Sequence, residues 1–295
     1  GHCAAHPGFL RIDSVRMLLM ALSCWLPLAA QDFSRISVEK VAGGYTFTEG
    51  PVWSHDGYLL FSDVPNNRIH KYTPGAGATV FREGSDGANG NTFDAKGRLY
   101  TCESRTRRVT RTDKKGKIEV LAEKWDGKRL NAPNDIVVRR DGHVYFTDPA
   151  FGSQAETRDL DYYGVYHITP KGEMELIARP AGRPNGLALS PDGKILYVAN
   201  SDERNLRAYD LDNNGKASNE RVLVSGIDGV PDGIRVDENG NIYITARGLA
   251  VYSPAAKLLT TIEIPETPAN CAFGDPDLKT LYLSLIHISE PTRPY

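Results

Sequence analysis

The sequence predicts an all-β fold, a six-bladed β-propeller with four-stranded blades. A unit of two apolar strands joined by an Asp–Gly or Asn–Gly turn recurs along the chain, and no stretch has sustained helical periodicity. The turn glycines and their counterpart in the sixth unit are Gly57, Gly97, Gly142, Gly193, Gly240 and Leu278. Their spacings of 40, 45, 51, 47 and 38 residues fit one propeller blade per unit. Closing the blades into a ring leaves few exposed sheet edges, as a long all-β chain requires.

The six units predict the two inner strands of each blade in chain order. They span residues 49–61, 89–100, 134–145, 185–197, 232–243 and 270–282. The glycine of each turn accepts a positive φ, which a two-residue hairpin needs. Residues 36–42 precede the first unit and are predicted to form an outer strand of the last blade. After the strand at 280–285 no convincing third strand follows, so we expect the last blade to be incomplete and residues 286–295 to be a non-native tail.

The N-terminal residues read as a targeting segment. Arg11 and Arg16 precede an apolar run from Met17 to Ala30, which ends in small residues before a polar start. The run is too short to span a membrane comfortably. We therefore expect residues 1–30 to be upstream residues and a secretory signal, and residues 31–285 to be the propeller. This predicts a periplasmic or secreted protein with no membrane attachment after cleavage.

Composition excludes several functional classes. The formal net charge of -2 argues against a nucleic-acid partner, which calls for a basic excess. Outside the leader only Cys102 and Cys271 remain, in apolar strand patterns of different units, so we expect buried thiols without a disulfide. No Cys/His cluster indicates zinc, and neither a G-x-S-x-G elbow nor an H-E-x-x-H motif occurs. The oligomeric state, monomer or dimer, stays open.

A polar residue opens every unit, eight positions before the turn position. Equivalent positions in a cyclic array lie at one height, and the first strand of a blade is innermost, so these residues should ring the central axis. They are Glu49, Asn89, Asn134, Asn185, Asp232 and Asn270. Any one of them alone fits a turn residue better. Six carboxylates and carboxamides in register, with no His or Cys, instead suit a hard divalent cation, and calcium better than magnesium.

Further residues should surround this ring on the same face. The second strand of each unit returns to it, which brings Glu103 and Asp148 there, and the long insertion at 148–163 can act as a lid. We expect the substrate-binding residues to be Asn89, Glu103, Asn270, Tyr162 and Arg247.

Three motifs carry a resemblance to a known family. Glu49-Gly-Pro-Val-Trp, Pro184-Asn-Gly-Leu and Pro231-Asp-Gly-Ile resemble the senescence marker protein/gluconolactonase family of six-bladed propellers. Leu130-Asn-Ala-Pro-Asn-Asp-Ile and Tyr145-Phe-Thr-Asp-Pro-Ala-Phe-Gly look like its bacterial branch. The likeness runs from about Val38 to Leu283.

The resemblance implies a divalent-metal lactonase that opens sugar lactones and commonly binds calcium. It implies Glu49, Asn185 and Asp232 as metal ligands, with Asn134 contacting metal or substrate. Two positions depart from the pattern: Ala132 replaces an arginine that contacts substrate in some members, and Ser104 replaces a histidine common in bacterial relatives. Both departures concern the substrate more than the metal.

The leading hypothesis is therefore hydrolysis of a small lactone with a calcium ion as Lewis acid. Calcium acidifies bound water only weakly, so a carboxylate base is needed; Asp232 is the first candidate and Asp148 the second. The alternatives are a phosphotriesterase of the diisopropyl fluorophosphatase type and a non-catalytic, calcium-stabilised interaction propeller.

Overall fold

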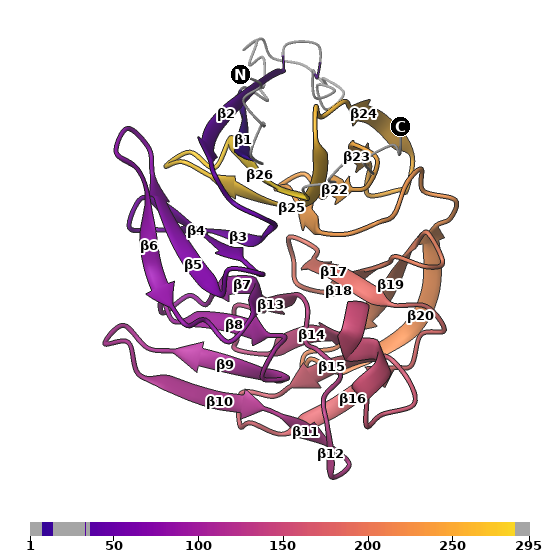
Figure 1. Ribbon diagram of the computed structural model, residues 1–295. Helices are drawn as coiled ribbons and strands as arrows, with labels where there is room; N and C mark the ends of the chain where they lie inside the picture. Colours follow the sequence, from indigo (N-terminus) through magenta and orange to yellow (C-terminus); the bar gives the residue numbers. More distant parts are fainter. Residues whose placement is uncertain (1–7, 14–32, 34–35, 287–295) are drawn as a thin grey trace, which may run out of the picture.

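The computed structural model describes residues 8–13, 33 and 36–286, which form six four-stranded antiparallel sheets around a central axis (Figure 1). This confirms the predicted six-bladed propeller. Its described part contains one short 3-10 helix and no helix long and apolar enough to cross a membrane. The predicted signal segment at 17–30 and residues 287–295 lie outside the described residues.

Each of the first three blades is built from one continuous stretch of chain. Blade 1 comprises β3 (Thr48–Ser54), β4 (Tyr58–Asp63), β5 (Arg68–Thr73) and β6 (Gly77–Glu83). Blade 2 comprises β7 (Ala88–Phe93), β8 (Leu99–Glu103), β9 (Arg108–Thr112) and β10 (Ile118–Ala122). Blade 3 comprises β13 (Ile136–Val138), β14 (Val144–Asp148), β15 (Gly164–Ile168) and β16 (Met174–Ala178). A small hairpin of β11 (Lys124–Trp125) and β12 (Lys128–Arg129) precedes blade 3, and the helix η1 (Gly152–Thr157) lies within its insertion.

The remaining blades close the ring. Blade 4 comprises β17 (Pro184–Leu189), β18 (Ile195–Asn200), β19 (Asn205–Leu211) and β20 (Ala217–Val224). Blade 5 comprises β21 (Ile234–Val236), β22 (Ile242–Thr245), β23 (Leu249–Tyr252) and β24 (Leu258–Ile262). Blade 6 comprises β25 (Thr267–Gly274), β26 (Thr280–Ile286), β1 (Gly8–Asp13) and β2 (Ser37–Gly43), from the axis outward. The predicted outer strand at 36–42 is confirmed as β2.

Two expectations about blade 6 are wrong. The blade is complete, because β1 lies between β26 and β2, where Leu10 is opposite both Leu283 and Lys40. Residues 8–13 therefore belong to the fold, although the sequence placed them in the leader. Their apolar side chains serve two interfaces, as alternation in a strand allows: Phe9 faces blade 1, while Leu10 and Ile12 face blade 5. Ile286, assigned to the foreign tail, ends β26 opposite Thr267.

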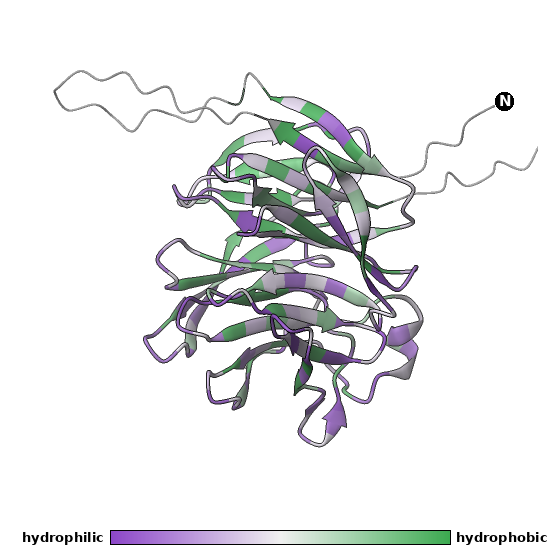
Figure 2. Cartoon of the chain, turned by 90° about the vertical axis from the view of Figure 1, so that its left-hand side faces the viewer, coloured by the Kyte–Doolittle hydropathy of each residue, from purple (hydrophilic) through white to green (hydrophobic). Residues whose placement is uncertain are grey.

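The hydrophobic core is divided among the blade interfaces. Six clusters of buried side chains each join two neighbouring blades, so every sheet is covered on both faces. Edge-on, the hydrophobic residues follow the strands and the hydrophilic ones gather in the connecting turns (Figure 2). Cys102 and Cys271 are buried free thiols within these clusters, as predicted.

Candidate metal and lactone site on the propeller axis

The ring of predicted donors lies on the innermost strands, or directly before them. Five of the six donors are buried. The sixth, Asp232, is half-buried, but its carboxyl group is enclosed by protein. Neighbouring inner strands are very close here: the amide of Gly90 donates to Asn134 O at 2.7 Å, and that of Gly186 donates to Asp232 O at 3.0 Å. A side chain at Gly186 would lie 2.4 Å from the same Asp232 oxygen. The glycines that follow the donors thus let the blades converge on the axis.

Direct contacts connect the two carboxylates of the ring to their neighbours. Asn270 Nδ2 donates to Glu49 Oε2 at 3.1 Å, and the Gly50 amide donates to the same oxygen at 2.8 Å. Asp232 interacts with both Glu49 and Asn185. The structure therefore brings Glu49, Asn185, Asp232 and Asn270 together.

The two remaining donors, Asn89 and Asn134, belong to the neighbouring blades 2 and 3. Asn89 Oδ1 is buried without a hydrogen-bond partner among the described residues. The Asn134 backbone is fixed by a hydrogen bond from its amide to Thr147 O at 2.9 Å.

Burial changes the acidity of the carboxylates. Desolvation and the nearby Asp135 raise the pKa of Glu49 to about 7, against the opposing effect of the Gly50 amide. Desolvation, followed by the charges of Glu49 and Asp135, raises the pKa of Asp232 well above its usual range. Carboxyl groups confined in this way repel one another, so a cation between them removes a large electrostatic penalty.

The donor set fits a hard oxygen-seeking cation. Asp232 Oδ1 and Asn89 Oδ1 are buried with no hydrogen-bond partner among the described residues, which is costly unless another ligand satisfies them. Within the same part of the chain, no group of three or more His, Cys, Asp or Glu side chains is arranged for a metal. The ring instead combines two carboxylates with amide oxygens, the mixture that calcium accepts.

Asp148 is buried, and both of its carboxylate oxygens already accept hydrogen bonds. Its two oxygens accept the amides of Asn131 and Ala132, each at 2.8 Å. Burial raises its pKa to about 7, opposed first by these amides and then by Arg107. Asn131 in turn donates to Asp148 O and Tyr162 O. Asp148 thus holds the loop that leads to Asn134.

The predicted substrate-binding residues Glu103, Tyr162 and Arg247 have partners other than the six donors. Glu103 is buried but bonded to Thr106, Thr110 and Arg108. Tyr162 lies under the guanidinium of Arg179, 3.9 Å from the ring centroid. Arg247 is exposed and paired with Asp228 at 3.0 Å. Among the residues that the structure describes, these contacts of Glu103, Tyr162 and Arg247 involve none of the donors, so their role in substrate binding stays a prediction.

Two residues near the axis were missed by the sequence reasoning: Asp135 and Arg235. Asp135 Oδ2 lies 3.4 Å from Asn270 Nδ2 and 3.7 Å from Arg235 Nη1. A signal for both existed in the repeat. Asp135 stands where four of the six units have glycine after the donor, and Arg235 is the charged residue in an otherwise uncharged position of the repeat.

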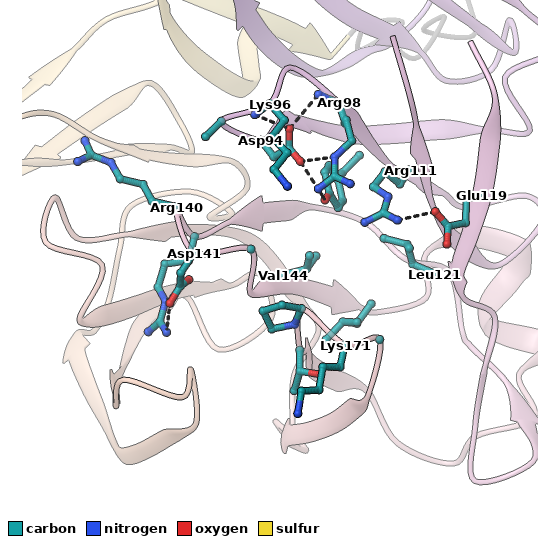
Figure 3. Close-up of a pocket in the computed structure, with 18 residues that line it drawn as sticks. Asp94, Lys96, Arg98, Arg111, Glu119, Leu121, Arg140, Asp141, Val144 and Lys171 are labelled. Atoms are coloured by element: carbon teal, nitrogen blue, oxygen red, sulfur yellow. Dashed lines mark hydrogen bonds and ion pairs between the residues drawn. The ribbon is translucent and has the colours of Figure 1, made fainter. Parts of the chain in front are cut away.

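A cavity of about 430 Å³ lies elsewhere, on the hairpin face between blades 2 and 3 (Figure 3). Its charged side chains are partly paired, as Arg98 with Asp94 at 2.6 Å and Arg111 with Glu119 at 2.5 Å. It contains none of the predicted donors. The predicted donors therefore lie outside this cavity.

Known proteins resemble this chain over most of its length. A gluconolactonase from Zymomonas mobilis is 35% identical over 282 residues, covering 85% of this chain and 79% of its own. The pentonolactonase XacC from Haloferax volcanii is 27% identical over 252 residues, covering 80% of each chain. The solved structure of a gluconolactonase from Xanthomonas campestris superposes with a TM-score of 0.74 at 32% identity, covering 82% of this chain and 87% of that one.

The family profile described as SMP-30/Gluconolactonase/LRE-like region matches residues 47–287, which contain all six donors and all but the two N-terminal strands of the propeller. The chain belongs to the SMP-30/gluconolactonase/LRE-like family.

Proposed function

We propose that this protein is a metal-dependent lactonase that opens sugar lactones, with calcium held by Glu49, Asn134, Asn185 and Asp232. Membership of the family and similarity to gluconolactonases over most of the chain make it a lactone hydrolase. The observation that carries the metal part is the burial of Glu49 and Asp232 together, with Asp232 Oδ1 left without a partner among the described residues. A calcium ion there would polarise the lactone carbonyl and stabilise the negative charge that develops on its oxygen.

The residues of the ring divide the remaining work. The Asp232 carboxylate oxygen that does not bind the cation takes a proton from the attacking water, whose oxygen adds to the carbonyl carbon. The ring C–O bond then breaks, and the same carboxyl returns the proton to the departing alkoxide, which leaves a hydroxy acid. Asn89, whose side-chain oxygen is also free, is placed to bind a sugar hydroxyl. We assign the base to Asp232 because both oxygens of the other candidate, Asp148, already accept backbone amides.

An extracytoplasmic location forms part of this proposal and rests on the apolar segment 17–30. Because β1 precedes that segment, cleavage after residue 30 would remove a strand of blade 6. N-terminal sequencing of the protein recovered from periplasmic and cytoplasmic fractions tests this: periplasmic protein beginning near residue 31 supports secretion, and intact cytoplasmic protein contradicts it.

The activity is tested with purified protein in weak buffer. Opening of gluconolactone or a related sugar lactone releases an acid, so a pH indicator should report turnover above the spontaneous rate. Chelator should abolish this turnover and calcium should restore it. Asp232→Asn keeps an oxygen ligand but loses the base, so calcium should largely be retained while turnover falls by about 10²–10⁴.

The two alternative functions give different results in the same assay. A phosphotriesterase would prefer fluorophosphate or aryl phosphotriester substrates. An interaction propeller would bind calcium and gain thermal stability from it but hydrolyse neither class. Calcium-loaded protein that is inactive across a broad lactone panel would refute the lactonase proposal.

A further inference from the structure

We infer that Asp135 and Arg235 form a charged pair beneath the donor ring, which positions Asn270 and Glu49 and sets how tightly the ring binds its cation. The inference rests on the metal site of the proposed function, whereas the lactonase activity could exist without it.

Asp135 brings a carboxylate into the axis at a position that most blades leave empty. The residues directly after the donors are Gly50, Gly90, Asp135, Gly186, Gly233 and Cys271. The Asp135 side chain fills the space beside one of these glycines, because a side chain at Gly90 would lie 2.6 Å from Asp135 Oδ1. It is 1% exposed, and its Oδ1 accepts the Ile136 amide at 2.9 Å. This acidic side chain is therefore fixed and desolvated.

Arg235 is the charged member of a second ring, three positions after the donors. That ring consists of Val52, Thr92, Val137, Ala188, Arg235 and Phe273. These side chains line a cavity of about 350 Å³ at the hairpin end of the axis. Arg235 is 17% exposed and donates to Ile234 O at 2.7 Å and to Pro51 O at 3.4 Å. An isolated arginine in such surroundings is costly unless a nearby anion compensates it.

Asp135 provides that anion and connects it to the donor ring. Its Oδ2 lies 3.7 Å from Arg235 Nη1 and accepts a hydrogen bond from Asn270 Nδ2 at 3.4 Å. The same Asn270 nitrogen donates to Glu49 Oε2 at 3.1 Å, while Asn270 Oδ1 accepts the Cys271 amide. The side-chain amide of Asn270 thus bridges Glu49, a proposed metal ligand, and the carboxylate of Asp135.

The charges joined by these contacts determine which cation the axis can hold. With a cation bound and all three carboxyl groups ionised, Glu49, Asp135 and Asp232 would contribute three negative charges and Arg235 one positive charge, which leaves two negative charges. A divalent ion neutralises this sum. Asp135 attracts such an ion and Arg235 repels it, so removing either one should change calcium affinity in opposite directions.

The test is calcium titration by calorimetry on chelator-treated protein. Asp135→Asn should weaken calcium binding about tenfold or more, since charge count tunes such sites over decades of affinity. Arg235→Met should tighten calcium binding and lower the melting temperature of the calcium-free protein, because Asp135 is then buried without its partner. Arg235→Lys keeps the charge and should retain most of the wild-type affinity. The double variant Asp135→Asn/Arg235→Met should return toward the wild-type affinity.

Matched controls are Glu238→Gln and Arg140→Met, two exposed hairpin residues that change charge by the same amounts. Both should leave calcium affinity at the wild-type value. Equal affinity in wild type and all axial variants, or parallel changes in Asp135→Asn and Arg235→Met, would overturn the inference while leaving the lactonase proposal intact. Wild-type protein that opens lactones without binding calcium would overturn both the inference and the metal part of the function.

Discussion

The axis and the hairpin turns of this propeller use the same dipeptides for different purposes. Asn185–Gly186 and Asp232–Gly233 lie at the axis, whereas Asp192–Gly193 lies in a turn. At the axis the glycine permits close backbone contact and the polar side chain is enclosed. In the turn Gly193 adopts a φ of 68°, and Asp192 accepts the Lys194 amide in the open. The same type of dipeptide therefore encloses its polar side chain at the axis and leaves it exposed in this turn.

The largest expected effect distinguishes the carboxylates at the axis, Asp232 and Glu49, from Asp192 in the hairpin turn. Asp232→Ala and Glu49→Ala should each abolish tight calcium binding and reduce lactone turnover by about 10²–10⁴, because a metal ligand or the base is lost. Asp192→Ala removes a hairpin cap and should leave both properties unchanged, with a stability change of about 0.5 kcal/mol. Calorimetry and the indicator assay measure both. Equal calcium content in the three variants would contradict the site assignment.

The second prediction concerns the glycines. Gly186→Ala should destabilise the protein by about 3 kcal/mol, since the new methyl group would lie 2.4 Å from Asp232 O and neighbouring inner strands would have to separate. In Gly172→Ala, in the β15–β16 turn, the new methyl group would meet no atom within 4 Å. This substitution should cost only about 1 kcal/mol of stability, because alanine disfavours the φ of 87°. Denaturant unfolding measures both changes. A cost at Gly172 equal to that at Gly186 would show that close approach is not what the axial glycine provides.

The smallest effect is the dependence on pH, which has opposite signs in the two regions. The raised pKa of Glu49, about 7, means that the folded protein without metal holds a proton that the unfolded chain releases near pH 4.5. Its contribution to stability is lost as pH rises toward 7, while calcium binding, which needs the carboxylate, strengthens over the same range. Hydrogen bonds from Ser190 and Lys194 lower the pKa of Asp192, so its contribution is lost only in acid, below its usual pKa of 3.8.

Thermal unfolding between pH 5 and 8, with and without calcium, checks the sign at Glu49. The stabilisation by calcium should grow with pH in the wild type and grow less in Glu49→Gln. A calcium effect that is constant across this range in both proteins would rule out Glu49 as a ligand that must lose its proton.

The repeat was sufficient to predict six blades and to bring the predicted donors to the inner strands, because spacing and register are encoded locally. Asp135 and Arg235 escaped because they occupy positions at which the other units carry glycine or uncharged residues, and only the three-dimensional axis brings them to Asn270. The bond from Arg108 to Glu103 could not be predicted from the repeat, because Arg108 belongs to the next strand. The strand at 8–13 could not be recognised, since one of its two pairing partners, β26, lies at the other end of the chain.

That composite last blade orders the events of folding. Blades 1 to 5 can each form as soon as their own residues leave the ribosome, because every pairing within them is local. Leu10 must wait for Leu283, so β1, which is synthesised before the other described strands, is among the last to be paired on both sides. Until then the faces of blades 1 and 5 that contact blade 6 lack their cover. On blade 1 this cover includes Phe9, whose ring centroid lies 4.7 Å from that of Phe61. The face of blade 1 that contacts blade 6 therefore stays uncovered while blades 2 to 5 are synthesised.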